Sequence, residues 1–153
     1  MRKRSSYRPK GVIMDTMGHV MRGFAPVREH GKATTLKIRN HQSLSCMVAG
    51  AGTREDIDNL IAAMNVAEAL AIVAAIGHEY RSEITAAQNA IFSMGQRGVQ
   101  KGRFLFTGPE LTALNLGMEI HDAQLDVCTV GQLEMALDFV AREIRAKRAR
   151  AIA

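Results

Sequence analysis

The sequence is short of the residues that build disulfide frameworks and aromatic cores: it has two cysteines, no tryptophan, three prolines and 5% aromatic residues. Two cysteines, Cys46 and Cys128, cannot form a framework of disulfides, so we interpret them as free buried thiols. No apolar run reaches the length of about 18 residues that a membrane span needs. No apolar segment follows the basic N-terminus, as it would in a signal peptide. These absences predict a reduced, intracellular setting without a membrane.

What the chain has in abundance are alanine, leucine and methionine, with nine methionines among 153 residues. These residues favour helices, whereas β-branched residues are sparse. A chain of this length is expected to form one domain and to bury roughly two thirds of its unfolded surface. The composition therefore predicts an all-α protein that needs no disulfide or metal to fold.

The net charge of +5 is unevenly distributed along the chain. Residues 1–10 carry +5 and residues 142–153 carry +4, so the stretch between them carries −4. We predict a flexible basic arm over residues 1–12 and a single helical domain over residues 13–150. An anionic partner is expected at the basic ends rather than on the acidic body.

Apolar spacing and capping residues place the first helices. After an irregular lead-in over 13–30, a helix is expected from about 32 to 48, ended by glycines at 50 and 52. Thr53 is a good N-cap, with Asp56 three residues later. The next apolar stripe covers 54–94, and Gly77 either breaks it or lies within one longer helix.

Residues 95–109 are rich in glycine and predict a long connection, whose Phe-Leu-Phe segment at 104–106 folds back on the bundle as a plug. Thr107 and Pro109 predict the next helix start. Residues 109–148 form one helix, or two if Thr129 and Gln132 make a capping box. The expected architecture is an antiparallel helical bundle of long helices. Six acidic residues and no lysine or arginine lie between 104 and 141, so this region could pair with the basic segment 22–39 or simply face solvent.

The spacing of chemically active residues does not indicate a catalytic or metal site. There is no Glu-x-x-His pair for a di-iron centre, the cysteines are isolated, and no phosphate loop of the Walker type occurs. We therefore expect no metal, no cofactor and no enzymatic activity.

Two polar pairs stand out on otherwise apolar helices. Asn65 and Glu68 lie one turn apart, where a polar core position either fixes helix register or lines a ligand pocket. His121 and Asp122 could form a proton carrier oriented by a carboxylate, or a buried histidine paired to an acid.

Cationic residues form two further groups. Arg97, Lys101 and Arg103 lie among glycines and could hold a phosphate, or the segment could be a solvated loop. The basic ends could bind nucleic acid in a salt-sensitive way. Their candidate residues are Arg2, Lys3, Arg4, Arg8, Lys10, Arg145, Lys147, Arg148 and Arg150.

Several short blocks resemble a family of small uncharacterised proteins encoded by bacteriophages and prophages of Gram-negative bacteria. The blocks are Asn40-His41, GAGTREDID at 50–58, AMNVAEAL at 63–70, GRFLFTGPEL at 102–111 and LGMEIHDAQL at 116–125. The resemblance spans about residues 37–145. It implies a small helical phage accessory protein in the host bacterial cytoplasm, with no active site to transfer.

These observations predict a non-catalytic protein that acts by binding. It would counter host defence by capturing an anionic ligand, such as a nucleotide signal, or by binding a host protein. The alternative is a DNA- or RNA-binding accessory protein that uses the basic termini. A third hypothesis is an enzyme that uses His121 and Asp122. Long amphipathic helices in a short chain also predict a homo-oligomer.

Overall fold

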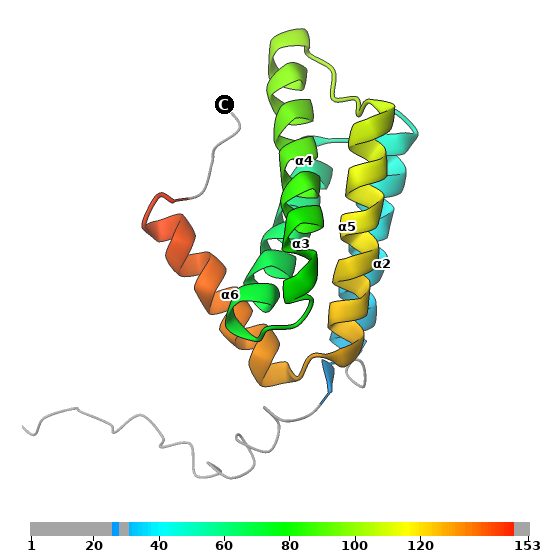
Figure 1. Ribbon diagram of the computed structural model, residues 1–153. Coiled ribbons are helices and arrows are strands. Elements are labelled where there is room, and N and C mark those ends of the chain that lie inside the picture. The colour runs from blue at the N-terminus through cyan, green and yellow to red at the C-terminus, as the bar shows by residue number, and fades with distance from the viewer. Residues whose placement is uncertain (1–25, 28–30, 149–153) are drawn as a thin grey trace, which may run out of the picture.

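A computed structural model describes residues 26–27 and 31–148 of the chain (Figure 1). In these residues five α-helices pack together and no strand is formed, which confirms the all-α prediction. The helices are α2 (Gly31–Val48), α3 (Arg54–Val73), α4 (Arg81–Lys101), α5 (Gly108–Val127) and α6 (Val130–Arg145), with a 3-10 turn, η2 (His78–Tyr80), before α4.

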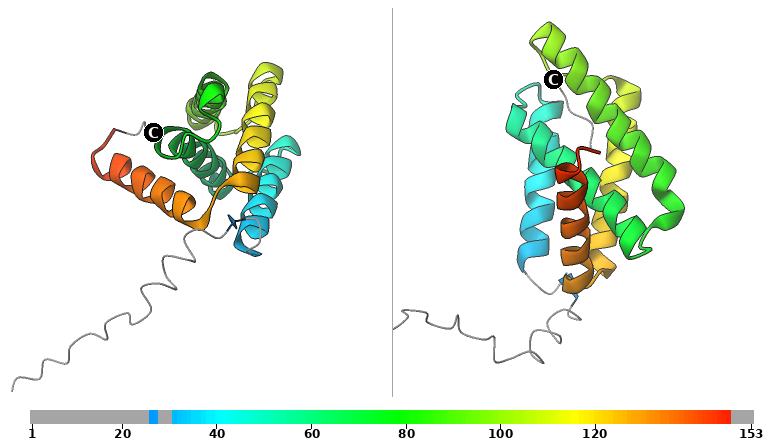
Figure 2. Two further views of the ribbon diagram at one scale, coloured as in Figure 1. Left: turned by 60° about the horizontal axis from the view of Figure 1, so that its bottom comes forward. Right: turned by 90° about the vertical axis from the view of Figure 1, so that its left-hand side faces the viewer.

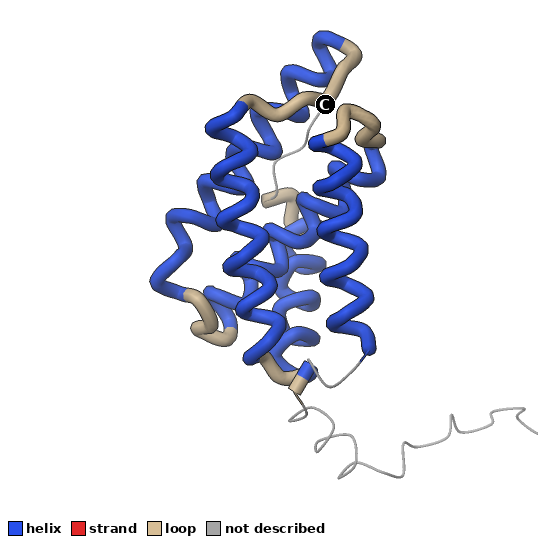
Figure 3. Tube along the Cα trace, turned by 90° about the vertical axis from the view of Figure 1, so that its right-hand side faces the viewer, coloured by secondary structure: helices blue, strands red, loops and turns tan. Residues whose placement is uncertain are grey.

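Successive helices run in alternating directions along the bundle, joined by short loops at its two ends (Figure 3). α3 is the central helix, because it packs against α2, α4, α5 and α6. α6 packs against α3 and leans outward from the other helices, so that its C-terminal end stands clear of them (Figure 1).

Capping chemistry in the sequence fixes three of the helix starts. Thr53, Thr107 and Thr129 each accept a hydrogen bond from the backbone three residues on, and each forms a complete capping box. The box at Thr129 divides the region 109–148 into α5 and α6. Gly77, with a φ of 72°, lies in the turn between α3 and η2, so the stripe 54–94 is also two helices.

The prediction of a long connection over 95–109 is wrong in its first half, because α4 continues to Lys101. Gly95 and Gly98 are buried helix residues rather than turn residues. A Cβ atom on Gly98 would lie 2.1 Å from Cδ1 of Phe104, so this glycine lets the ring pack against the helix. Phe104 and Phe106 pack against the core, which confirms the predicted plug.

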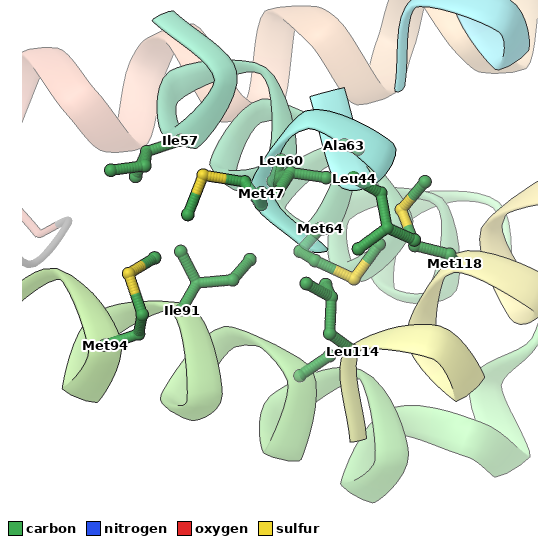
Figure 4. Packing of buried hydrophobic residues seen from close by; sticks show 11 residues of the cluster. Leu44, Met47, Ile57, Leu60, Ala63, Met64, Ile91, Met94, Leu114 and Met118 are labelled. Carbon is green, nitrogen blue, oxygen red and sulfur yellow. The ribbon is translucent and has the colours of Figure 1, made fainter. Parts of the chain in front are cut away.

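Methionine and aliphatic side chains from α2, α3, α4 and α5 fill the main core (Figure 4). Met64 and Leu60 of α3 are fully buried at its centre, and Met47, Ile91 and Leu114 reach them from three other helices. A second cluster around Leu70 and Leu125 attaches α6 through the buried Ala136. Unbranched methionine fills irregular gaps, so this core suits a chain with few aromatic residues.

At the base of the bundle Pro26 and Val27 lie beside the start of α6, and the Val27 N–H donates to the Cys128 carbonyl at 3.0 Å. The predicted arm over 1–12 and most of the predicted lead-in lie outside the described residues. None of the described helices is both long and apolar enough to cross a bilayer.

Candidate functional site

A groove of about 440 Å³ opens between α3, α4 and α6. In the view from the α6 side, α6 lies in front of α3 (Figure 2, right), and residues of these two helices and of α4 line the groove. Most of its wall is apolar, and a polar group lies within it. The lining residues are Ile61, Met64, Asn65, Glu68, Ile72, Thr85, Gln88, Ile91, Phe92, Phe139, Val140, Glu143, Ile144 and Arg148.

The polar group in the groove is organised by one amide. Nε2 of Gln88 donates to Oε2 of Glu68 at 2.9 Å and to Oδ1 of Asn65 at 3.3 Å. Asn65 and Glu68 are one turn apart on α3, so both point to the same side of that helix, and Gln88 faces them from α4. All three side chains are half-buried. The sequence-predicted pair therefore lines a pocket, and the structure adds Gln88 and Thr85 to it.

Charges at the groove are only partly compensated. At the rim Arg148 makes two hydrogen bonds of 2.8 Å to the two carboxylate oxygens of Glu143. This pairing lowers the pKa of Glu143 and raises the pKa of Arg148. In the part of the chain that the structure describes, Glu68 forms no ion pair. The groove thus contains the carboxylate of Glu68, which is hydrogen-bonded to the neutral amide of Gln88.

A separate polar seam joins α2 to α5. Nε2 of His41 donates to Oδ2 of Asp122 at 2.6 Å, and Nζ of Lys37 lies 2.5 Å from Oδ1 of Asp126. The pairing of Lys37 with Asp126 confirms one contact between the predicted basic segment 22–39 and the acidic region 104–141. Both pairs are partly exposed, so they position α2 on α5 more than they stabilise it.

The structure does not join His121 to Asp122, since His41 takes the carboxylate. The His121 side chain is buried, with 3% of its surface exposed. Burial lowers its pKa to about 4, against smaller opposing effects of Gln124 and Asp122, and nearby Lys37 and His41 lower it further. His121 is therefore a neutral buried side chain near pH 7. Its predicted pairing with the adjacent acid as a proton carrier is not formed.

Arg97 lies within α4 and has a structural role. Its guanidinium binds both carboxylate oxygens of Glu110, at 2.8 and 2.7 Å, and the carbonyl of Leu105 at 2.8 Å. These contacts hold the segment before α5 against α4 and lower the pKa of Glu110. Lys101 and Arg103 are exposed nearby. Of the three predicted phosphate ligands, two therefore remain available to an anion.

The predicted nucleic-acid-binding residues fall into two sets. Arg145 and Lys147 are exposed at the end of α6, and Arg148 pairs with Glu143. The others, Arg2, Lys3, Arg4, Arg8, Lys10 and Arg150, lie outside the described residues. Within 26–27 and 31–148, no group of three or more histidine, cysteine or carboxylate side chains is placed to hold a metal ion.

The described residues form an all-α bundle of five helices with an open, polar-centred groove between α3, α4 and α6. Comparison with family models, with curated proteins and with solved structures finds no match to this chain. The resemblance to phage proteins stays a prediction.

Proposed function

We propose that this protein is a non-catalytic binding protein that holds a small organic molecule in the groove between α3, α4 and α6. The observation that carries the proposal is the contact of Gln88 with both Asn65 and Glu68 inside a largely apolar groove. A concave site with apolar walls and a few convergent polar groups is the usual form of a small-molecule site. The binding function follows the class expected from the sequence.

The chemistry of the groove favours a flat ligand that donates hydrogen bonds. Phe92 and Phe139 supply aromatic wall on α4 and α6, against which a planar ring can pack. Glu68 accepts hydrogen bonds, and the amides of Asn65 and Gln88 both donate and accept them. A nucleobase with an exocyclic amino group meets these requirements. We therefore propose the base of a nucleoside or nucleotide as the bound group.

The phosphates of a nucleotide are expected to contribute little to binding. The cation on the groove wall is Arg148, and Glu143 already holds it. Glu68 and Glu143 also repel a phosphate at close range. A nucleoside should thus bind about as well as its monophosphate, which distinguishes this groove from an anion site at Lys101 and Arg103.

The test is calorimetric titration with adenosine, cytidine, guanosine and their monophosphates. At least one nucleoside is expected to bind the wild-type protein, with its monophosphate within a few-fold. Glu68→Gln should weaken that binding at least about tenfold, because a hydrogen bond to a charged acceptor contributes about 1.5–3 kcal/mol. The matched control is Glu119→Gln, which makes the same change at an exposed position on α5 outside the groove.

Two results would contradict the proposal. The first is no detectable heat from any nucleoside. The second is binding that needs the phosphate and is lost in Lys101→Ala and Arg103→Ala but kept in Glu68→Gln, since that result moves the ligand to the end of α4.

A further inference from the structure

α6 carries an exposed apolar row that the other described residues leave uncovered. Leu137 and Ile144 have 50% and 56% of their surface exposed, and Ala141 between them is also exposed. Their spacing of four and three residues places all three on one side of the helix. Ala136 and Val140, on the neighbouring side, hold α6 against α3 and the second core cluster. One helix thus has an apolar surface wider than its contact with the bundle.

A stripe of four charges runs beside this row, and the two signs are segregated along it. Glu134 and Asp138 lie in the first half of α6, and Arg142 and Arg145 in the second. All four are exposed, and none forms an ion pair with another described residue. This order suits the helix dipole, but the dipole does not account for the exposed leucine and isoleucine beside it.

We propose that α6 pairs with α6 of a second copy of this chain in an antiparallel, two-fold symmetric dimer. In an antiparallel pair the flank of one helix faces the same flank of the other with its order reversed. Glu134 and Asp138 of one copy then face Arg142 and Arg145 of the other, and the two-fold axis repeats this set of contacts. The rows of Leu137, Ala141 and Ile144 pack against each other beside the paired stripes. A two-fold interface requires such a self-complementary patch.

Charge selects the antiparallel arrangement over the parallel one. In a parallel two-fold pair the two stripes lie on opposite sides of the interface, so their charges stay unpaired. Only the antiparallel pair brings the acids of one stripe to the arginines of the other, and flanking charges of this kind set the orientation of paired helices. A helix of 16 residues offers about 24 Å for this contact, so the interface is small and a weak dimer is expected. The dimer does not require a groove ligand, because Leu137, Ala141 and the four charged residues do not line the groove. Ile144 is the residue that the row shares with the groove wall.

Sedimentation equilibrium from micromolar to millimolar concentration tests the proposal on the full chain. The wild type should show a monomer–dimer equilibrium, and Leu137→Glu should weaken the dimer at least tenfold. The matched control is Leu116→Glu, at an exposed leucine on α5, which should leave the dimer unchanged. Far-UV circular dichroism checks that both variants stay helical.

Reversing the charges of the stripe distinguishes the antiparallel dimer from a nonspecific apolar contact between two copies. The double variant E134R/D138R carries only bases along the stripe, and R142E/R145E carries only acids. Each alone should stay monomeric, and an equimolar mixture should form a heterodimer. A wild type that stays monomeric at every concentration would overturn the proposal. So would a dimer that Leu137→Glu and both charge variants leave intact.

Discussion

Gln124→Met is expected to lower the free energy of unfolding by about 2–3 kcal/mol, a large fraction of the stability of a small domain. Nε2 of Gln124 donates to the Ala67 carbonyl at 2.9 Å and to the Ile76 carbonyl at 2.8 Å. These bonds tie α5 to the end of α3 at a side chain that is 2% exposed. Methionine has a similar length but no hydrogen-bond donor, so the variant loses both bonds, to the Ala67 carbonyl and to the Ile76 carbonyl.

Urea unfolding of the wild type and the variant measures this loss. The matched control is Gln96→Met, at an exposed glutamine in the C-terminal half of α4, where surface substitutions usually change stability by less than about 0.5 kcal/mol. If Gln124→Met costs no more than Gln96→Met, the two carbonyl contacts do not hold the α3–α5 junction.

Stability is expected to fall by as much as about 3 kcal/mol as the pH drops from 6.5 to 4, because His121 must stay neutral in the folded protein. Its pKa is 6.5 in the unfolded chain and about 4 when folded. Between these values the unfolded chain binds more protons than the folded one, so stability increases with pH over this window. The full contribution is present above pH 6.5.

The measurement is the free energy of unfolding against pH for the wild type and for His121→Leu. Subtracting the two curves removes the contributions of other groups, including Asp56, Glu110 and Glu143, whose lowered pKa values destabilise the fold in acid. The difference should slope through the window and flatten above it. Parallel curves would show that the protonation of His121 is not linked to folding.

Three helix starts were predictable because short-range chemistry determines them. Thr53, Thr107 and Thr129 each form a capping box with the residue three positions later. A capping box is visible in the sequence and needs no contact with a distant part of the chain. The region 95–101 was misread because glycine has two uses. Gly98 looks like a turn residue in sequence, yet it makes room for Phe104, and only the packing of that ring reveals this.

The groove was predictable on one helix only. Asn65 and Glu68 were found because polar side chains on an apolar helix need partners. Gln88 and Phe139 lie on other helices, and which helices face α3 depends on tertiary packing. His121 and Asp122 show the opposite error, since residues adjacent in sequence point about 100° apart on a helix and meet different neighbours.

The most direct test of the proposed binding site is a two-dimensional NMR titration of the isotope-labelled wild type with the nucleoside that binds best. We expect the largest chemical-shift changes at the side-chain amides of Asn65 and Gln88 and at the backbone of α3, α4 and α6 around the groove. Shifts confined to the segment around Lys101 and Arg103, or to the seam between α2 and α5, would contradict the proposed binding site.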